Sequence, residues 1–194
     1  ALLGEVVVDF QMDTLCSGRQ TYGHRSLNPE PIELPNASLE GYIERLRQVN
    51  VIADHHERRA EIEGQVTTIL EAEGCSTALD AELLTTVTFL VENPQAIVGS
   101  FSESHLSLPT QVLVTPMKKQ QRYFPMWKED GKLAAKFITI SNGTDGNFDR
   151  VRHGNERVLR ARLADAEFFY SEDQKTPLSE KVERTRNVVF QVKL

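Results

Sequence analysis

The chain has 194 residues, with 22 Lys and Arg against 28 Asp and Glu, so its formal net charge is −6. Hydrophobic residues make up 40% and charged residues 26%, which excludes an intrinsically disordered chain. No apolar run approaches the roughly 18 residues that a membrane-spanning helix needs. Cys16 and Cys75 match no metal-binding spacing, so we expect free thiols in a cytosolic protein. The acidic balance argues against a general nucleic-acid binder.

The first 37 residues have β and connector character. Residues 5–10 are apolar and β-branched and predict a strand, and residues 17–25 predict a loop leading into a second strand. Residues 26–37 contain three of the eight prolines, which excludes a helix there. The chain starts inside one apolar segment and stops at Leu194 inside another, so we expect it to be an excised piece of a longer protein.

Three helical patterns follow, each with apolar residues spaced three and four apart. They cover residues 38–50, 54–73 and 80–92. Each begins at a residue whose side chain can cap a helix N-terminus, namely Ser38, Asp54 and Asp80. We expect them to form a helical subregion of about 38–92, inserted between β segments.

β character returns after this region. Residues 95–101 predict a short strand, and the segments flanking Glu129-Asp130-Gly131 predict a hairpin. The segment between them, LPTQVLVTPMKKQQ (108–121), is compatible with a helix that Pro116 breaks or kinks. Two more helices are predicted, at 154–170 and from Pro177 to about Asn187. Strands and helices occupy separate blocks, which favours an α+β fold with sheet layers and flanking helices.

The charge is unevenly distributed. Residues 117–162 contain eleven basic and five acidic residues, so this stretch carries +6 and the remaining residues carry −12. Tyr123, Phe124 and Trp127 are interleaved with the basic residues, an arrangement that suits a phosphate backbone with exposed bases. Alternation along a hairpin produces the same pattern, with the aromatic residues in the core and the lysines in solvent. Pattern alone leaves both interpretations open.

Part of the basic stretch lies on a predicted helix. His153, Arg157 and Arg160 share one face because they are spaced three and four apart. The apolar stripe of the same helix lies on another face, so we expect the basic face to be exposed. A solvated helix face without a ligand is the alternative.

Several chemistries lack their usual motifs. The sequence contains no GxxxxGK[ST] or GxGxxG phosphate loop, no HExxH or CxxC metal motif and no GxSxG nucleophile motif. His55 and His56 are adjacent, and adjacent side chains point about 100° apart on a helix, which suits a shared metal poorly. We therefore assign no catalytic residue and no metal site.

Six unusual segments occur in a fixed order. They are SGRQTYGHR (17–25), VIADHHERRAEI (51–62), LVENP (90–94), VTPMKKQQRYFP (114–125), DGKLAAKFITISNG (130–143) and GNERVLRARLADAEFF (154–169). This series resembles the β subunit of bacterial heterotetrameric glycyl-tRNA synthetase, and the similarity covers essentially the whole chain. It corresponds to the N-terminal to middle part of that subunit. The chain departs from the family pattern at Ser26, Asn93, Gln111 and Gln120.

The resemblance implies a role in charging tRNA(Gly) with glycine in the cytoplasm. In that α2β2 enzyme the α subunit carries the active site and uses ATP, while the β subunit mainly handles tRNA. The resemblance also implies that residues 1–194 form a single domain similar to the B3/B4 editing domain of phenylalanyl-tRNA synthetase. We expect no cofactor, no metal and no membrane contact for this chain.

On this resemblance, we expect a set of basic residues to contact the phosphates of the tRNA acceptor arm. The set is Lys118, Lys119, Arg122, Arg157 and Arg160. Tyr123 is expected to stack on an unpaired base. Two alternatives stay open. One is a protein scaffold that docks the α subunit. The other is a vestigial editing-type deacylase at His24 and Arg25, where the competing interpretation is a turn glycine beside a structurally hydrogen-bonded histidine.

Overall fold

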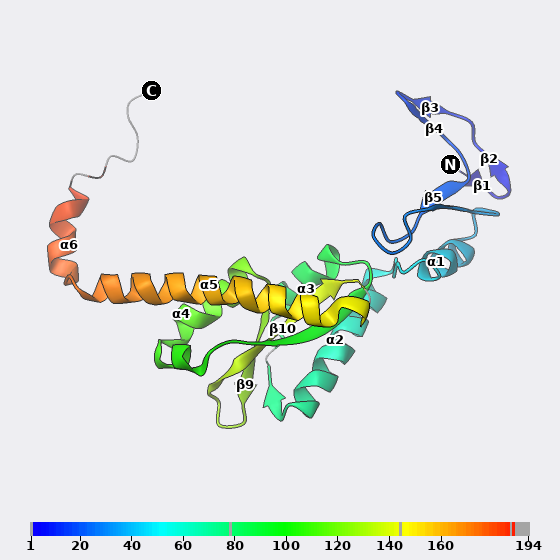
Figure 1. Cartoon of the computed structure of the whole chain (residues 1–194). Helices are drawn as coiled ribbons and strands as arrows, with labels where there is room; N and C mark the ends of the chain where they lie inside the picture. The colour runs from blue at the N-terminus through cyan, green and yellow to red at the C-terminus, as the bar shows by residue number, and fades with distance from the viewer. Residues whose placement is uncertain (1, 78, 144, 187, 189–194) are drawn as a thin grey trace.

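The computed structural model describes residues 2–77, 79–143, 145–186 and 188 and has a mixed α+β fold, as predicted. Its centre is an antiparallel four-stranded sheet (Figure 1). The strands lie in the order β7 (Cys75–Ser76), β9 (Phe124–Lys128), β10 (Leu133–Asn142) and β8 (Pro94–Ser100). The predicted hairpin joins β9 to β10, and its turn residue Gly131 has a φ of +77°, a conformation that favours glycine. The B3/B4 likeness stays a prediction.

One face of the sheet is covered by two helices, α2 (His55–Ala72) and α3 (Ala81–Leu90). Successive residues of β10 point to opposite faces, and Ile138 packs on this side whereas Phe137 packs on the other. Phe137 lies opposite Gly99 of β8. A Cβ built on Gly99 would lie 2.3 Å from the Phe137 ring, so only glycine admits the ring there.

The opposite face of the sheet is covered by helices that come later in the chain. They are α4 (Thr110–Thr115), the π-helix η2 (Pro116–Gln120) and α5 (Phe148–Gln174). Leu113 and Met117 pack against Leu159 and Leu163 over Phe137. Pro116 marks the change from α4 to η2, so the expected break at this proline is confirmed.

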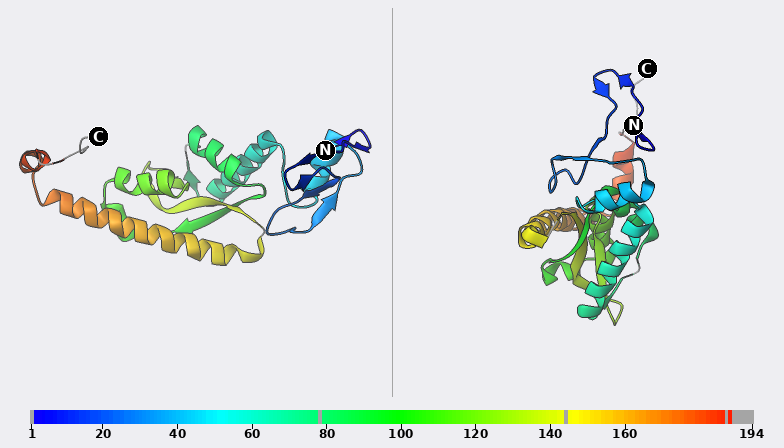
Figure 2. Two further views of the ribbon diagram at one scale, coloured as in Figure 1. Left: turned by 90° about the horizontal axis from the view of Figure 1, so that it is seen from above. Right: turned by 90° about the vertical axis from the view of Figure 1, so that its right-hand side faces the viewer.

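Helix α5 is longer than its predicted span of 154–170. It begins at Phe148, lies along the sheet, and extends past it toward α6 (Leu178–Thr185) (Figures 1 and 2). The predicted end of α6 at Asn187 lies outside the described residues. A single-turn helix, η3 (Asp145–Asn147), precedes α5, and another, η1 (Glu103–Ser107), follows β8.

The N-terminal segment forms short hairpins rather than the single strand predicted for residues 5–10. The paired strands are β1 (Leu2–Leu3) with β2 (Val6–Val7), β3 (Gln11–Met12) with β4 (Leu15–Cys16), and β5 (Gln20–Tyr22) with β6 (Pro31–Glu33). Gly4 and Asp13 adopt positive φ values of 60° and 54°, so the chain turns on both sides of residues 5–10, and the alternation pattern does not report these turns.

The three predicted N-caps are confirmed. Ser38 caps α1 (Leu39–Arg47) by accepting from the N–H of Gly41 at 3.2 Å, and Asp54 and Asp80 cap α2 and α3 in the same way. The expected helical subregion 38–92 is not purely helical, because β7 lies inside it and pairs with β9. Figure 1 shows α1 beside the N-terminal hairpins, whereas α2 and α3 cover the sheet.

Candidate nucleic-acid interface

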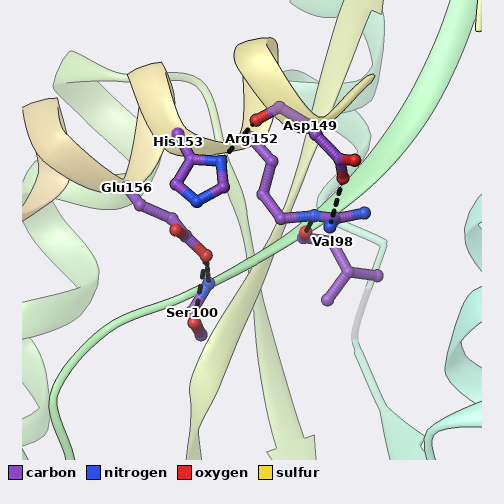
Figure 3. Close-up of polar contacts among 6 residues, drawn as sticks. All are labelled: Val98, Ser100, Asp149, Arg152, His153 and Glu156. Atoms are coloured by element: carbon purple, nitrogen blue, oxygen red, sulfur yellow. Dashed lines mark hydrogen bonds and ion pairs between the residues drawn. The ribbon is translucent and has the colours of Figure 1, made fainter. Parts of the chain in front are cut away.

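Polar side chains fix the first half of α5 to the free edge of β8 (Figure 3). Nε of Arg152 donates to the carbonyl oxygen of Val98 at 3.0 Å. Oε1 of Glu156 accepts from the main-chain N–H of Ser100 at 2.9 Å and from its hydroxyl at 3.0 Å. Among the described strands β8 pairs only with β10, so these bonds satisfy main-chain groups of β8 that an edge strand would otherwise leave without a partner. They also set the rotation of α5 about its axis.

Arg157 and Arg160 lie on the outer face of α5. Leu159 and Leu163 are fully buried on the inner face, and a rotation of about 100° per residue turns both arginines away from that core. Both are exposed. Within the part of the chain that the structure describes, neither guanidinium takes part in an ion pair or hydrogen bond. The sequence prediction of an exposed basic face is confirmed for these two residues.

The other predicted cations lie on η2 and the turn after it. Lys118 is half-buried and forms an ion pair with Asp80, the N-cap of α3. The Lys118 ammonium, helped by the N–H of Leu83, lowers the pKa of the Asp80 carboxyl. Lys119 and Arg122 are exposed, and among the described residues their side chains have no ion-pair partner. Of the three cations in this segment, Lys119 and Arg122 are therefore the two whose charges are available to a ligand.

Arg122 has an unusual backbone conformation. Its φ is +61°, in the left-handed region, which costs a non-glycine residue about 1–3 kcal/mol. The N–H of Gln121 bonds to the carbonyl of Pro116 at 3.1 Å, and that of Tyr123 to the carbonyl of Met117 at 2.9 Å, so the turn is closed on both sides of Arg122. An exposed arginine occupies a position that favours glycine.

Tyr123 is buried and is not placed to stack on a base in this structure. Its side chain is 3% exposed, and its ring stacks on Phe137 with a centroid separation of 4.6 Å. Its hydroxyl donates to Oδ1 of Asn155 on α5 at 2.6 Å. Burial raises the pKa of Tyr123 to about 12. The aromatic residue that follows the basic turn therefore belongs to the core, as the competing hairpin interpretation expected.

An open cleft of about 220 Å³ lies between α3 and the α4–η2 segment. Leu83 and Val114 supply its apolar lining, and Glu82 and Thr86 line the α3 side. The residues contributed by the other side are Gln111, Thr115, Lys118, Lys119 and Arg122. No residue of α5 lines the cleft. The structure thus separates the predicted basic residues into two surfaces, the cleft and the outer face of α5.

The GHR segment is built as a turn. A Cβ on Gly23 would lie 2.5 Å from the Val49 side chain, and the N–H of His24 donates to the Val49 carbonyl at 2.9 Å. His24 is 2% exposed, and its Nδ1 lies 3.3 Å from the N–H of Ser26. Arg25 is exposed. This geometry favours a structural role for His24, because a buried imidazole cannot reach an RNA ester without rearrangement.

Comparison with known proteins decides the family. A family model described as glycyl-tRNA synthetase beta subunit matches residues 1–194. The chain belongs to the glycyl-tRNA synthetase β-subunit family. It is 45% identical over 194 residues to the glycine–tRNA ligase β subunit of Moorella thermoacetica, and 45% identical over 195 residues to that of Bacillus subtilis. Each alignment covers 100% of this chain but 28% of the relative, so the chain spans little more than a quarter of the length of these relatives.

Across the described residues, no three His, Cys, Asp or Glu side chains gather in a way that could hold a metal ion. The adjacent rings of His55 and His56 have centroids 4.0 Å apart. Over the same residues, no helix is long and apolar enough to cross a membrane.

The sequence analysis missed the polar residues that position the basic ones. The charge count reveals Arg152 only as one of the basic residues, and nothing in it distinguishes Glu156 or Asn155. Arg152 and Glu156 are four apart and in phase with Leu159 and Leu163, so a polar pair on the apolar stripe was the available signal. For the Asp80–Lys118 ion pair, which joins segments 38 residues apart, we find no local signal.

Proposed function

We propose that this chain is a tRNA-contacting part of a glycine–tRNA ligase β subunit, which binds the acceptor arm of tRNA(Gly) and positions it for ATP-dependent glycylation at the α subunit. The supporting observation is the outer face of α5. There Arg157 and Arg160 are exposed and have no ion-pair or hydrogen-bond partner among the described residues, while Arg152 and Glu156 hold the opposite face on β8.

This arrangement suits phosphate binding for two physical reasons. A guanidinium offers planar, paired donors that match phosphate oxygens, and no carboxylate in the described part of the chain pairs with these two. The helix is also held in place before the ligand arrives, so less conformational entropy is lost on binding. The acidic remainder of the chain, at −12, would limit non-specific attraction to other nucleic acids.

In this proposal the chain binds RNA and performs no chemistry. Glycine and ATP would be handled by the α subunit of an α2β2 enzyme in the cytoplasm, as the resemblance implies. The chain would need no cofactor of its own. Its residues would act on the tRNA through phosphate contacts, which fix position without reading sequence.

The test is the double variant Arg157→Ala/Arg160→Ala in the full-length β subunit assembled with its α partner. We expect the affinity for tRNA(Gly) to fall about tenfold or more, because two charge-assisted contacts are lost. Lys132→Ala is the matched control, since it removes one exposed cation that is already paired with Asp130 at 3.1 Å. Unchanged tRNA affinity in the double variant would contradict the proposal.

Two further measurements distinguish the proposed function from its two alternatives. If α5 docks the α subunit instead, the double variant weakens subunit association in analytical ultracentrifugation and leaves the tRNA affinity of the assembled enzyme unchanged. If the chain is an editing deacylase, the enzyme hydrolyses mischarged tRNA(Gly) and His24→Ala abolishes that activity. We expect no deacylation above background, because His24 is buried in the turn.

A further inference from the structure

The cleft between α3 and α4–η2 has opposite charges on its two walls. The α3 wall carries Glu82, and the other wall carries Lys119 and Arg122. All three are exposed. Among the described residues none of these three side chains has an ion-pair partner. A ligand that fits this cleft must therefore present an anionic group to one wall and a hydrogen-bond donor to the other.

The lining between the charged walls is apolar. Leu83 and Val114 face the cleft, and both belong to well-packed parts of the molecule, Leu83 to the core beneath α3 and Val114 to the cluster around Leu113. The Asp80–Lys118 ion pair lines the cleft and joins its two walls. A flat, apolar group would gain buried surface on the floor between them.

The volume limits the size of the ligand. At about 220 Å³, the cleft is smaller than the roughly 300–1,000 Å³ of sites that enclose drug-sized molecules. It can accept one base with its sugar and phosphate at the open rim. The small volume of the cleft favours a single unpaired base over a base pair.

The backbone at Arg122 indicates that the cation is placed for a purpose other than stability. A glycine would satisfy φ = +61° without strain, yet the position holds an exposed arginine at the rim of the cleft. Strain of this kind concentrates at ligand-binding positions.

We propose that the cleft binds one unpaired nucleotide of an RNA. Its phosphate lies against Lys119 and Arg122, its base covers Leu83 and Val114, and an exocyclic amino group donates to Glu82. This inference rests on the proposed RNA-contacting function and adds a subsite with a base preference. Adenine, cytosine and guanine carry an exocyclic amino group that can donate to Glu82, whereas uracil offers only its ring N–H.

The experiment measures binding of single-stranded RNA trinucleotides to the full-length β subunit assembled with its α partner. We expect A and C trinucleotides to bind at least fivefold more tightly than the U trinucleotide. Glu82→Gln should abolish this preference, because an amide both donates and accepts. Lys119→Ala should weaken all three trinucleotides by a similar factor. Glu129→Gln, an exposed acid on the hairpin turn, is the control and should change nothing.

Three outcomes would overturn the inference. They are equal binding of the three trinucleotides by the unmodified enzyme, an unchanged preference in Glu82→Gln, and AMP competing as well as a trinucleotide, which would indicate a free nucleotide as the ligand. Arg157→Ala/Arg160→Ala keeps this test separate from the proposed function. If Arg157→Ala/Arg160→Ala loses tRNA affinity while Glu82→Gln and Lys119→Ala do not, the proposed nucleotide subsite is wrong and the proposed tRNA-contacting function stands. If tRNA affinity is unchanged in every variant, both are wrong.

Discussion

Glu156 on α5 and Ser100 at the end of β8 are joined by two hydrogen bonds to a single carboxylate oxygen, at 2.9 and 3.0 Å. This pair holds the basic part of α5 against the sheet edge. Glu156→Ala should cost about 1–2 kcal/mol, because the Ser100 N–H and hydroxyl lose a charged acceptor. Hydrogen–deuterium exchange of the full-length subunit should show faster exchange at the Ser100 amide.

A matched control for this variant is Glu172→Ala. Glu172 lies on the same helix and pairs only locally with Lys175, and exposed pairs of this kind contribute little to stability. We expect its exchange pattern at β8 to match the unmodified protein. Equal exchange at Ser100 in Glu156→Ala and Glu172→Ala would show that the Glu156 contact does not hold the helix.

Two substitutions of Arg122 separate the effect of its charge on RNA binding from the effect of its backbone strain on stability. Arg122→Gly removes the cation and relieves the left-handed backbone, whereas Arg122→Ala removes the same cation and keeps the strain. We expect both to lose RNA affinity equally, and the glycine variant to be more stable than the alanine variant by about 1 kcal/mol. Thermal unfolding and RNA binding of both variants check this. A glycine variant less stable than the alanine variant would contradict the strain argument.

The Asp80–Lys118 ion pair should make the stability depend on pH. The folded state lowers the pKa of the Asp80 carboxyl below its ordinary value of 3.8, so the stabilisation is present above that value and is lost as the pH falls through the lower, folded-state pKa. Asp80→Asn should therefore lower the melting temperature at pH 7, and the difference from the unmodified protein should shrink below pH 4. A constant difference from pH 7 to pH 3 would exclude this coupling.

Tyr123 should contribute to folding and not to RNA binding. Tyr123→Phe removes the hydroxyl that donates to Asn155 at 2.6 Å and should cost about 1 kcal/mol. The pKa of Tyr123, about 12, lies above the ordinary tyrosine value. The neutral hydroxyl therefore contributes fully to the stability of the fold below pH 10, and this contribution is lost as the pH rises toward 12. Chemical unfolding at pH 7 and pH 11 should show the gap between Tyr123→Phe and the unmodified protein narrowing at high pH.

Local patterns predicted the elements that are stabilised locally. Ser38, Asp54 and Asp80 identify helix starts because an N-cap acts within three residues, and the break at Pro116 follows from the missing N–H of proline. The N-terminal hairpins were not predictable in the same way. Asp13, a residue other than glycine, adopts a positive φ in the turn between β3 and β4, and alternation does not report such turns.

The candidate site was predictable only in part, for a physical reason. Exposure of Arg157 and Arg160 follows from helical periodicity, which is a local property. Burial of Tyr123 depends on Phe137 in another strand and Asn155 in another helix. Neutralisation of Lys118 depends on Asp80, which is distant in sequence. Whether a cation is free is thus decided by tertiary contacts that residue spacing does not encode.

The most direct test of the central claim is the salt dependence of tRNA(Gly) binding by the assembled enzyme. Each phosphate contact contributes a slope of about −0.7 to −0.9 in a plot of log affinity against log salt concentration. Arg157→Ala/Arg160→Ala should therefore make the slope shallower by about 1.4–1.8, whereas Lys132→Ala should leave it unchanged. A double variant with the slope of the unmodified enzyme would contradict the assignment of the α5 outer face to tRNA phosphates.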